Sequence, residues 1–289
     1  MKKLFICLSA VFLLIGFFNT KALAEEQLVP KRLSSIGDSI TVGMNAELPL
    51  ENHYASWANG YYGFWQWLFG LTNVNSHNQR ITAEFGRRGR RNYMEAESGA
   101  TSADFFEQSQ RAVGHQAFYV TVLLGNNDVC SDDLPLHRVK FVKNMWAGLS
   151  VLETGLTPGA TVYVVGIPDI TELWDAIKDK KALGIINCQD IWALNPLDLF
   201  PSTCMDLLNE APDVIQGYII QYNTILKNLV DIFNADSPNY YFYTEAVFLN
   251  GVSENEVSDI DCYHPSAEGQ AVLSDITWNA PDGPRFFDW

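Results

Sequence analysis

The sequence lacks the motifs that mark several large classes of enzyme. It has no His-Glu-x-x-His motif, no Cys-x-x-Cys pair and no cluster of histidines, so a zinc site is not expected. It also has no glycine-rich phosphate-binding loop and no Gly-x-Ser-x-Gly motif, which argues against a nucleotide-dependent enzyme and against the α/β-hydrolase fold. We therefore expect the protein to work without a metal ion or another cofactor.

Basic residues are scarce in this chain. Lys and Arg together number 19 whereas Asp and Glu number 34, which gives a formal net charge of −15 at pH 7. A surface of this sign repels phosphate backbones, so nucleic acid is not an expected partner, whereas a cationic substrate would be attracted. The single basic run, from Arg87 to Arg91, is interpreted as a solvated loop, and contact with an anionic membrane surface is the alternative.

Long apolar segments are absent after residue 24, which argues against a membrane-spanning helix. Residues 1–24 have the pattern of an export signal, with two lysines near the start, an apolar run over residues 4–18 and the small residues of Ala22-Leu23-Ala24. We expect cleavage before Glu25 and export to the periplasm or out of the cell. The removed segment contains three lysines and no acid, so the mature chain carries a net charge of −18. Residues 25–289 show no linker or repeat and are expected to form one domain.

Cysteine is also rare, with five in the chain. Four of them follow the expected cleavage site, namely Cys130, Cys188, Cys204 and Cys262. An even number of cysteines in an oxidising compartment predicts two disulfides, for which three pairings exist. A bond between Cys188 and Cys204 is favoured because it closes a short loop.

The apolar pattern predicts strands that alternate with helices. Strands are expected at residues 32–36, 92–97, 117–124, 161–167 and 240–244. Helices are expected at residues 102–113, 134–153, 215–233 and 266–278, and residues 181–213 are expected to form an irregular excursion over the site. The alternation of strands and helices predicts an α/β fold, in which a parallel sheet is covered on both faces.

An unusually aromatic run extends from Trp57 to Phe69. From Tyr61 onward its spacing is compatible with a helix that is buried against the sheet, which is the favoured interpretation. The alternative is that part of this run forms a wall of a substrate pocket.

Three short motifs contain the residue types of a hydrolytic site. Gly37-Asp38-Ser39 follows the first expected strand, Gly125-Asn126-Asn127-Asp128 follows the third, and Asp261 precedes His264 by three residues. Sites in open parallel sheets form at the carboxyl ends of strands, where Ser39 and Asn127 are expected to lie. A serine hydroxyl needs an imidazole to accept its proton, and the imidazole needs an acceptor that fixes its tautomer. The motifs therefore indicate a serine hydrolase.

Together with Gly99 in Glu97-Ser98-Gly99-Ala100-Thr101, these motifs resemble the four sequence blocks of the SGNH (GDSL-type) hydrolase family. They occur in the family's order and span nearly the whole mature chain, and Ile40 departs from the motif's name, which has leucine there. The resemblance implies a three-layer α/β/α, flavodoxin-like fold, whose central parallel sheet has about five strands in the order 2-1-3-4-5. It also implies that the chain is a GDSL-type esterase or lipase that hydrolyses carboxylic esters.

The resemblance implies a role for individual residues of these blocks. Ser39 would be the nucleophile, His264 the general base and Asp261 the residue that orients the imidazole. The oxyanion hole would consist of the N–H groups of Ser39 and Gly99 and the side-chain amide of Asn127.

Further residues are assigned around this site. The resemblance places Cys130 and Cys262 beside it, so a bond between these two is the second favoured disulfide. Asp128 is interpreted as a structural residue that bonds loop amides. The residues expected to contact the substrate are Asp38, Trp57 and Tyr263.

Members of this family act on lipid esters, lysophospholipids, thioesters, choline esters and acetylated sugars, and the four blocks do not separate these substrates. The many aromatic residues and the strong negative charge favour a choline ester, because a quaternary ammonium binds aromatic faces. A lysophospholipid or another lipid ester is the nearest alternative, and an acetylated sugar is a further one. A non-catalytic surface binding protein with the same fold is the alternative from a different class.

Overall fold

A five-stranded parallel sheet forms the centre of the computed structural model, which describes residues 30–129, 134–194, 212–281 and 283. The strands are β1 (Arg32–Gly37), β2 (Arg91–Met94), β3 (Tyr119–Leu123), β4 (Thr161–Val165) and β7 (Tyr240–Thr244). They lie in the order β2-β1-β3-β4-β7, and each neighbouring pair is parallel. Counted along the chain this order is 2-1-3-4-5, so the predicted α/β fold and strand order are confirmed.

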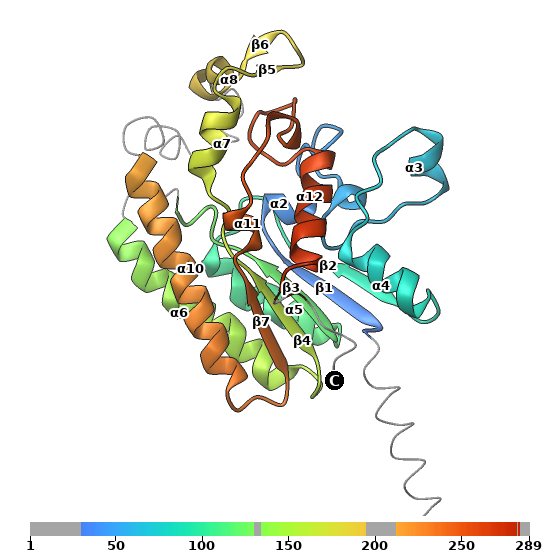
Figure 1. Ribbon diagram of the computed structural model, residues 1–289. Coiled ribbons are helices and arrows are strands. Elements are labelled where there is room, and N and C mark those ends of the chain that lie inside the picture. The colour runs from blue at the N-terminus through green and yellow to red at the C-terminus, as the bar shows by residue number, and fades with distance from the viewer. Residues whose placement is uncertain (1–29, 130–133, 195–211, 282, 284–289) are drawn as a thin grey trace, which may run out of the picture.

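Helices cover both faces of this sheet (Figure 1). One face carries α5 (Phe105–Gly114), α6 (Leu134–Gly155) and α10 (Pro212–Asn234), and the other carries α4 (His77–Phe85) and α12 (Ala267–Trp278). Shorter helices lie in the connections, namely α2 (Ser39–Val42), α3 (Phe64–Leu68), α7 (Ile170–Ile177), α8 (Cys188–Leu194) and α11 (Ala246–Leu249). Three 3-10 turns are found at His53–Ala55, Ser102–Asp104 and Glu254–Glu256. In the described part of the chain, no helix combines the length and the apolar character that crossing a bilayer requires.

The strands divide their side chains between two hydrophobic cores. Val120 and Val122 of β3 pack in the larger core with α5, α6 and α10, whereas Tyr119 and Leu123 pack in the smaller core with α4 and α12. Successive side chains of a strand point to opposite faces, so β3 and β4, which lie between two helical layers, are apolar at nearly every position. This pattern explains why the buried strands could be recognised as continuous apolar runs.

The topology creates a crevice at the carboxyl ends of β1 and β3. The connection that leaves β1 passes over the face that carries α4, whereas the connection that leaves β3 contains α6 and passes over the opposite face. Adjacent strands whose connections leave toward opposite faces open a crevice beyond their carboxyl ends, where ligands bind in open α/β sheets. The residues that follow β1 and β3 therefore meet at one place.

The aromatic run differs from its prediction. Only the five residues Phe64–Leu68 form a helix, α3, and none of them is buried. Trp65 and Trp67 are each 64% exposed. The expected helix buried against the sheet is therefore wrong, because periodicity alone does not say whether a helix has a neighbour to pack against. The sequence also gave no prediction of α4, although Ser76 and Gln79 form a capping box at its start.

The expected excursion over residues 181–213 is partly regular. It begins with a small antiparallel hairpin of β5 (Lys181–Ala182) and β6 (Ile186–Asn187), which α8 follows directly. The N–H of Leu183 donates to the carbonyl oxygen of Asp259 at 3.0 Å, so this hairpin lies against the loop that precedes His264. Residues 195–211 lie outside the described part of the chain.

The disulfide of the described residues joins Cys188 to Cys262. Both favoured pairings are therefore wrong, because each assigned one of these two cysteines to a different partner. The physical reason is that the hairpin carries Cys188 to the loop of Cys262, although 74 residues separate them in the sequence. Cys130 and Cys204 lie outside the described residues.

This pairing predicts a measurable loss of stability. Replacing both residues, Cys188→Ser with Cys262→Ser, should lower the free energy of unfolding by up to about 4 kcal/mol, because the bond restricts a loop of more than 70 residues in the unfolded chain. Urea titration of the oxidised proteins measures this difference. Peptide mapping without reduction should recover a fragment pair that contains Cys188 and Cys262, and recovery of Cys188 with Cys204 would contradict the structure.

Candidate active site

Ser39 is the first residue of the short helix α2, immediately after β1. The preceding residue, Asp38, caps this helix, since its carboxylate accepts a hydrogen bond from the N–H of Ile40 at 2.9 Å. The N–H groups in the first turn of a helix have no acceptor inside the helix, so the N–H of Ser39 is available to a ligand. The local sequence therefore places a hydroxyl and a free N–H together at the carboxyl edge of the sheet.

Gly37 allows the chain to turn tightly before Ser39. A Cβ atom at this position would collide with the side chain of Thr41 and would lie 3.0 Å from the carbonyl oxygen of Leu123. The buried Gln108 of α5 accepts from the N–H of Gly37 at 2.9 Å and donates to its carbonyl oxygen at 3.0 Å. Gln108 therefore fixes the end of β1, a function that sequence reasoning missed because a single glutamine carries no motif.

Asp261 and His264 form a buried hydrogen-bonded pair. Nδ1 of His264 lies 2.6 Å from a carboxylate oxygen of Asp261, and both side chains are almost completely buried. The other carboxylate oxygen accepts from the N–H groups of Tyr263 and His264, at 2.9 and 3.0 Å. The ring is therefore held through Nδ1, which leaves Nε2 as the nitrogen that can exchange a proton.

Asn45 completes the surroundings of the Asp261 carboxylate. Its amide donates to the same oxygen as the histidine ring, at 2.5 Å. Burial alone raises the pKa of Asp261, but the hydrogen bonds from His264, Asn45 and the N–H of Tyr263 outweigh burial and lower this pKa. Asp261 is therefore an anion at neutral pH. Asn45 was missed by the sequence analysis, because nothing in the sequence connects it with a residue 216 positions away.

The loop that carries Asp261 and His264 is held in place by residues next to the hairpin of β5 and β6. Cys262 adopts a left-handed backbone conformation, with φ of 58°, and is bonded to Cys188. The buried Lys180 donates to the carbonyl oxygens of Glu254 and Val257 and pairs with Asp259 at 2.8 Å. Lys180 is a third residue that the sequence analysis missed, after Gln108 and Asn45.

The residues expected to form the oxyanion hole lie on adjoining loops. The amide of Asn127 donates to the carbonyl oxygen of Ala100 at 2.8 Å, which joins its loop to that of Gly99. Gly99 has a left-handed backbone, with φ of 81°. The carboxylate of Asp128 accepts from the N–H and the hydroxyl of Ser102, so its predicted bonding to a loop amide is present. The bond to Ala100 uses one hydrogen of the Asn127 amide, and the second hydrogen can donate to a ligand.

Asn126 and Asp38 connect these loops with Ser39. The amide of Asn126 donates to the Asp38 carboxylate at 2.9 Å. Burial disfavours the charged carboxylate and raises the pKa of Asp38 to about 6, although the hydrogen bonds from Asn126 and the N–H of Ile40 and the nearby His264 oppose this rise. Asp38 is completely buried, so its oxygens serve these partners. The hydroxyl of Ser39 and the ring of His264 are not hydrogen-bonded to each other in this structure.

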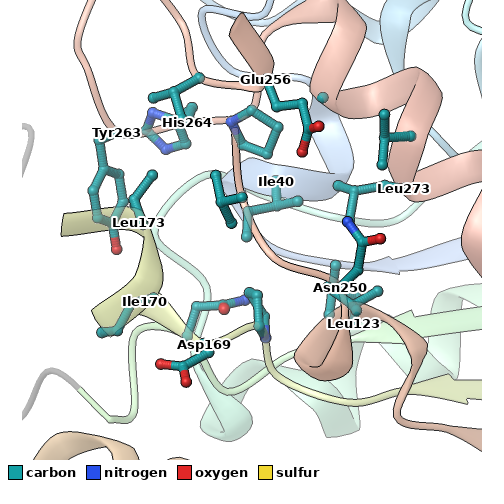
Figure 2. Close-up of a pocket in the computed structure, with 18 of the residues that line it drawn as sticks. Ile40, Leu123, Asp169, Ile170, Leu173, Asn250, Glu256, Tyr263, His264 and Leu273 are labelled. Carbon is teal, nitrogen blue, oxygen red and sulfur yellow. The ribbon is translucent and has the colours of Figure 1, made fainter. Parts of the chain in front are cut away.

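A cavity opens beside His264 (Figure 2). Its polar residues include Asn126, Asp169 and Glu256, and the ring of Tyr263 also lines it. Most of its wall is apolar and includes Ile40, Leu123, Ile170, Leu173, Val247 and Leu273. An apolar cavity with a few polar groups in its wall is the usual form of a small-molecule site.

Trp57 does not take part in this cavity. It is 1% exposed and packs against His77 in the smaller core, where its indole N–H contacts Thr41. Its expected contact with substrate is therefore corrected to a packing role. The backbone N–H of Trp57 also donates to the side-chain oxygen of the buried Gln270. The amide of Gln270 donates in turn to the carbonyl oxygen of Ile40, so Gln270 connects α12 with α2.

Among the described residues, no group of three or more His, Cys, Asp or Glu side chains could hold a metal ion.

Comparisons with known proteins give one family and several distant structural similarities. TesA shares 16% identity with this chain, with a TM-score of 0.48, and the comparison covers 86% of this chain and 96% of that chain. A catalytic mutant of Axe2, an acetylxylan esterase from Geobacillus stearothermophilus, shares 17% identity with a TM-score of 0.47, over 89% and 95% of the two chains. An extracellular lipase from Streptomyces rimosus shares 16% identity with a TM-score of 0.44, over 83% and 94%.

No curated protein sequence matches this chain. The family model of GDSL-like lipase/acylhydrolase matches residues 34–276. This range contains the four sequence blocks and almost the whole sheet. The chain therefore belongs to the GDSL-like lipase/acylhydrolase family, also called the SGNH hydrolases, and is a carboxylic ester hydrolase.

Proposed function

We propose that this ester hydrolase is a serine esterase in which Ser39, His264 and Asp261 form the catalytic triad. The observation that carries the proposal is the buried pair of Asp261 and His264, which leaves Nε2 of the ring free beside an apolar cavity. Ser39 Oγ attacks the ester carbonyl carbon while Nε2 takes its proton, and the imidazolium is stabilised by the Asp261 carboxylate. The ester C–O bond then breaks, and His264 protonates the leaving alkoxide. Water then attacks the carbonyl carbon of the acyl-serine while Nε2 takes its proton, the bond between the acyl group and Ser39 Oγ breaks, and His264 returns the proton to Ser39 as the carboxylic acid leaves.

The developing oxyanion is held by three donors in this proposal. They are the N–H groups of Ser39 and Gly99 and the second hydrogen of the Asn127 amide. Two observations support this assignment: Ser39 starts a helix, and the bond from Asn127 to Ala100 joins the two loops that carry the other donors. Donors that are fixed before reaction stabilise the transition state without a cost of reorganisation.

Lipid esters of the lysophospholipid type are the proposed substrates. The cavity beside His264 is bounded largely by aliphatic side chains from α7, α11 and α12, which suits an acyl chain. Burial of each methylene of such a chain contributes about 0.8 kcal/mol, so an apolar cavity favours longer acyl groups. Tyr263 and His264, which line the cavity next to each other, would then face the ester and its leaving group.

Choline esters of short acids are the second candidate substrates. The net charge of −15 and the position of the Tyr263 ring, whose centroid lies 5.1 Å from that of the His264 ring, favour a cationic leaving group. A choline headgroup also occurs in many lysophospholipids, so the acyl length separates the two candidates.

We also propose that the protein acts outside the cytoplasm, as one domain of residues 25–289. The disulfide between Cys188 and Cys262 supports this location, because such bonds persist in oxidising compartments. The apolar and small-residue pattern of residues 1–24 supports cleavage before Glu25.

The triad is tested by covalent labelling. A fluorophosphonate should label Ser39 in the wild-type protein, and Ser39→Ala or His264→Ala should lower kcat/KM by about 10⁴-fold or more, because nucleophile and base act as one unit. His53→Ala is the matched control, since His53 is an exposed histidine bonded to Glu51, and it should keep full activity. Absence of label at Ser39 in folded protein would instead indicate a binding protein without catalysis.

The substrate class is tested by acyl length. Wild-type protein should hydrolyse decanoyl esters faster than acetyl esters, and Leu173→Trp should lower kcat/KM for the decanoyl ester by roughly tenfold more than for the acetyl ester, since it fills the cavity. Leu249→Trp is the control, because Leu249 is 72% exposed on α11. A preference for acetylcholine over neutral acetyl esters, with no effect of the Leu173 variant, would support the choline-ester alternative.

The environment of Asp38 predicts a pH-dependent stability. Its folded-state pKa of about 6 exceeds the value near 4 of an unfolded chain, so its stabilising contribution is fully present below about pH 4 and is lost as pH rises through 6. Asp38→Asn removes the titrating carboxyl, so this variant does not lose stability as pH rises through 6. The buried side-chain oxygen of Asn126, which has no hydrogen-bond partner, can accept from the new amide.

The free energy of unfolding of Asp38→Asn relative to wild type should therefore rise by up to about 3 kcal/mol between pH 4 and pH 7. Urea titrations across this range measure the difference. Asp236→Asn, at an exposed position, should follow the wild-type curve. A constant difference between Asp38→Asn and wild type at all pH values would show that the carboxyl does not titrate in this range.

A further inference from the structure

A group of apolar rings is exposed on the loop that carries α3. We call residues 61–69 the aromatic tip. The exposed fractions of its side chains are 51% for Tyr61, 62% for Phe64, 64% for Trp65 and for Trp67, 49% for Leu68 and 70% for Phe69. Figure 1 shows α3 at the outer end of a loop that projects away from the sheet. Contiguous exposed apolar surface of this kind marks an interaction site.

The stem of this loop is fixed to the body of the protein. The hydroxyl of Ser76 donates to the carbonyl oxygen of Gly60 at 2.6 Å, which closes the loop at its base. The carboxylate of Glu47 accepts from the N–H and the hydroxyl of Thr72, at 3.0 and 2.8 Å. The tip is therefore held in a defined place, and its exposure is a property of the folded protein.

The rings of α3 and Phe69 contact one another. Trp65 stacks on Phe69 with ring centroids 6.3 Å apart, and Phe64 contacts Trp65 edge to face at 5.4 Å. Apart from Gln66, every side chain of α3 is apolar, and none is buried. A helix that is apolar on all sides suits immersion in an apolar medium, whereas a protein partner would cover one side of it.

The charge distribution points to the same medium. Residues 52–79 contain no Asp, Glu, Lys or Arg, although the chain as a whole carries a net charge of −15. Insertion of this segment into a lipid interface therefore desolvates no charged side chain. Tryptophan and tyrosine are also the residues that concentrate at the boundary between water and lipid, because each has an apolar ring with a polar group.

We propose that the aromatic tip docks the protein on the surface of a phospholipid bilayer by inserting its rings among the lipid headgroups. The contact is hydrophobic, so it needs no anionic lipid. Anionic lipid weakens it, because the protein and the membrane then carry charge of the same sign. The basic run from Arg87 to Arg91 is not required for this contact. The proposal concerns binding and does not depend on the catalytic triad.

The experiment measures sedimentation of the mature protein with vesicles of pure phosphatidylcholine. Wild-type protein should bind, and the Trp65→Ser/Trp67→Ser double variant should bind on the order of tenfold to a hundredfold more weakly, because two large rings lose their burial. Trp146→Ser is the matched control, since Trp146 is a 46% exposed tryptophan on α6, and it should bind as wild type. Activity on a short soluble ester and circular dichroism show that all three proteins are folded, and neither readout should change.

Ionic conditions separate this contact from an electrostatic one. Binding to phosphatidylcholine should change less than twofold between 50 and 500 mM salt, and adding phosphatidylglycerol should reduce it at low salt. Four outcomes would overturn the proposal: equal binding of the double variant and the wild type, a requirement for anionic lipid, self-association through the tip without vesicle binding, or binding of the tip to polysaccharide alone. Loss of esterase activity in Ser39→Ala with unchanged vesicle binding would leave the proposal intact.

Discussion

Four hydrogen bonds to the carboxylate of Asp261 hold the site of this protein together. They come from the ring of His264, the amide of Asn45 and two backbone N–H groups, so the carboxylate is buried as an anion without being left unpaired. The same bonds fix the orientation of the imidazole. The loop that carries them is fastened by a disulfide on one side and by Lys180 on another. The geometry of the histidine is therefore a consequence of many contacts outside the motif itself.

The central strands β3 and β4 could be predicted from the sequence because every residue in them is buried and most are apolar, whereas the strand order came from the resemblance to the SGNH family. Ser39 and Asp261 could be proposed as site residues because their neighbours form short motifs. Asn45, Gln108 and Gln270 were not found, because a single amide side chain has no signature and its partner lies far away in the chain. The disulfide was mispredicted for a related reason: a short hairpin, invisible to periodicity, brings Cys188 to Cys262.

The aromatic run shows a different limit of sequence reasoning. Trp57 and Trp65 belong to the same run, yet one is buried in the core and the other is exposed at the end of a loop. Composition gives the hydrophobicity of such a segment, and only the fold gives its surroundings. The protein is strongly acidic, so most of its surface is well hydrated. The aromatic tip carries no charge, so this small area can favour an apolar medium while the rest of the surface stays in water.

The position of β1 in the sheet has a consequence for biosynthesis. This strand is synthesised before the other strands, yet it lies between β2 and β3, and His264 belongs to the segment that follows the last strand of the sheet, β7. A chain released from the ribosome before that segment contains the proposed nucleophile Ser39 but lacks the proposed base His264. In the proposed mechanism such a fragment is inert, and hydrolysis begins only after the segment that follows β7 has packed against the end of β1.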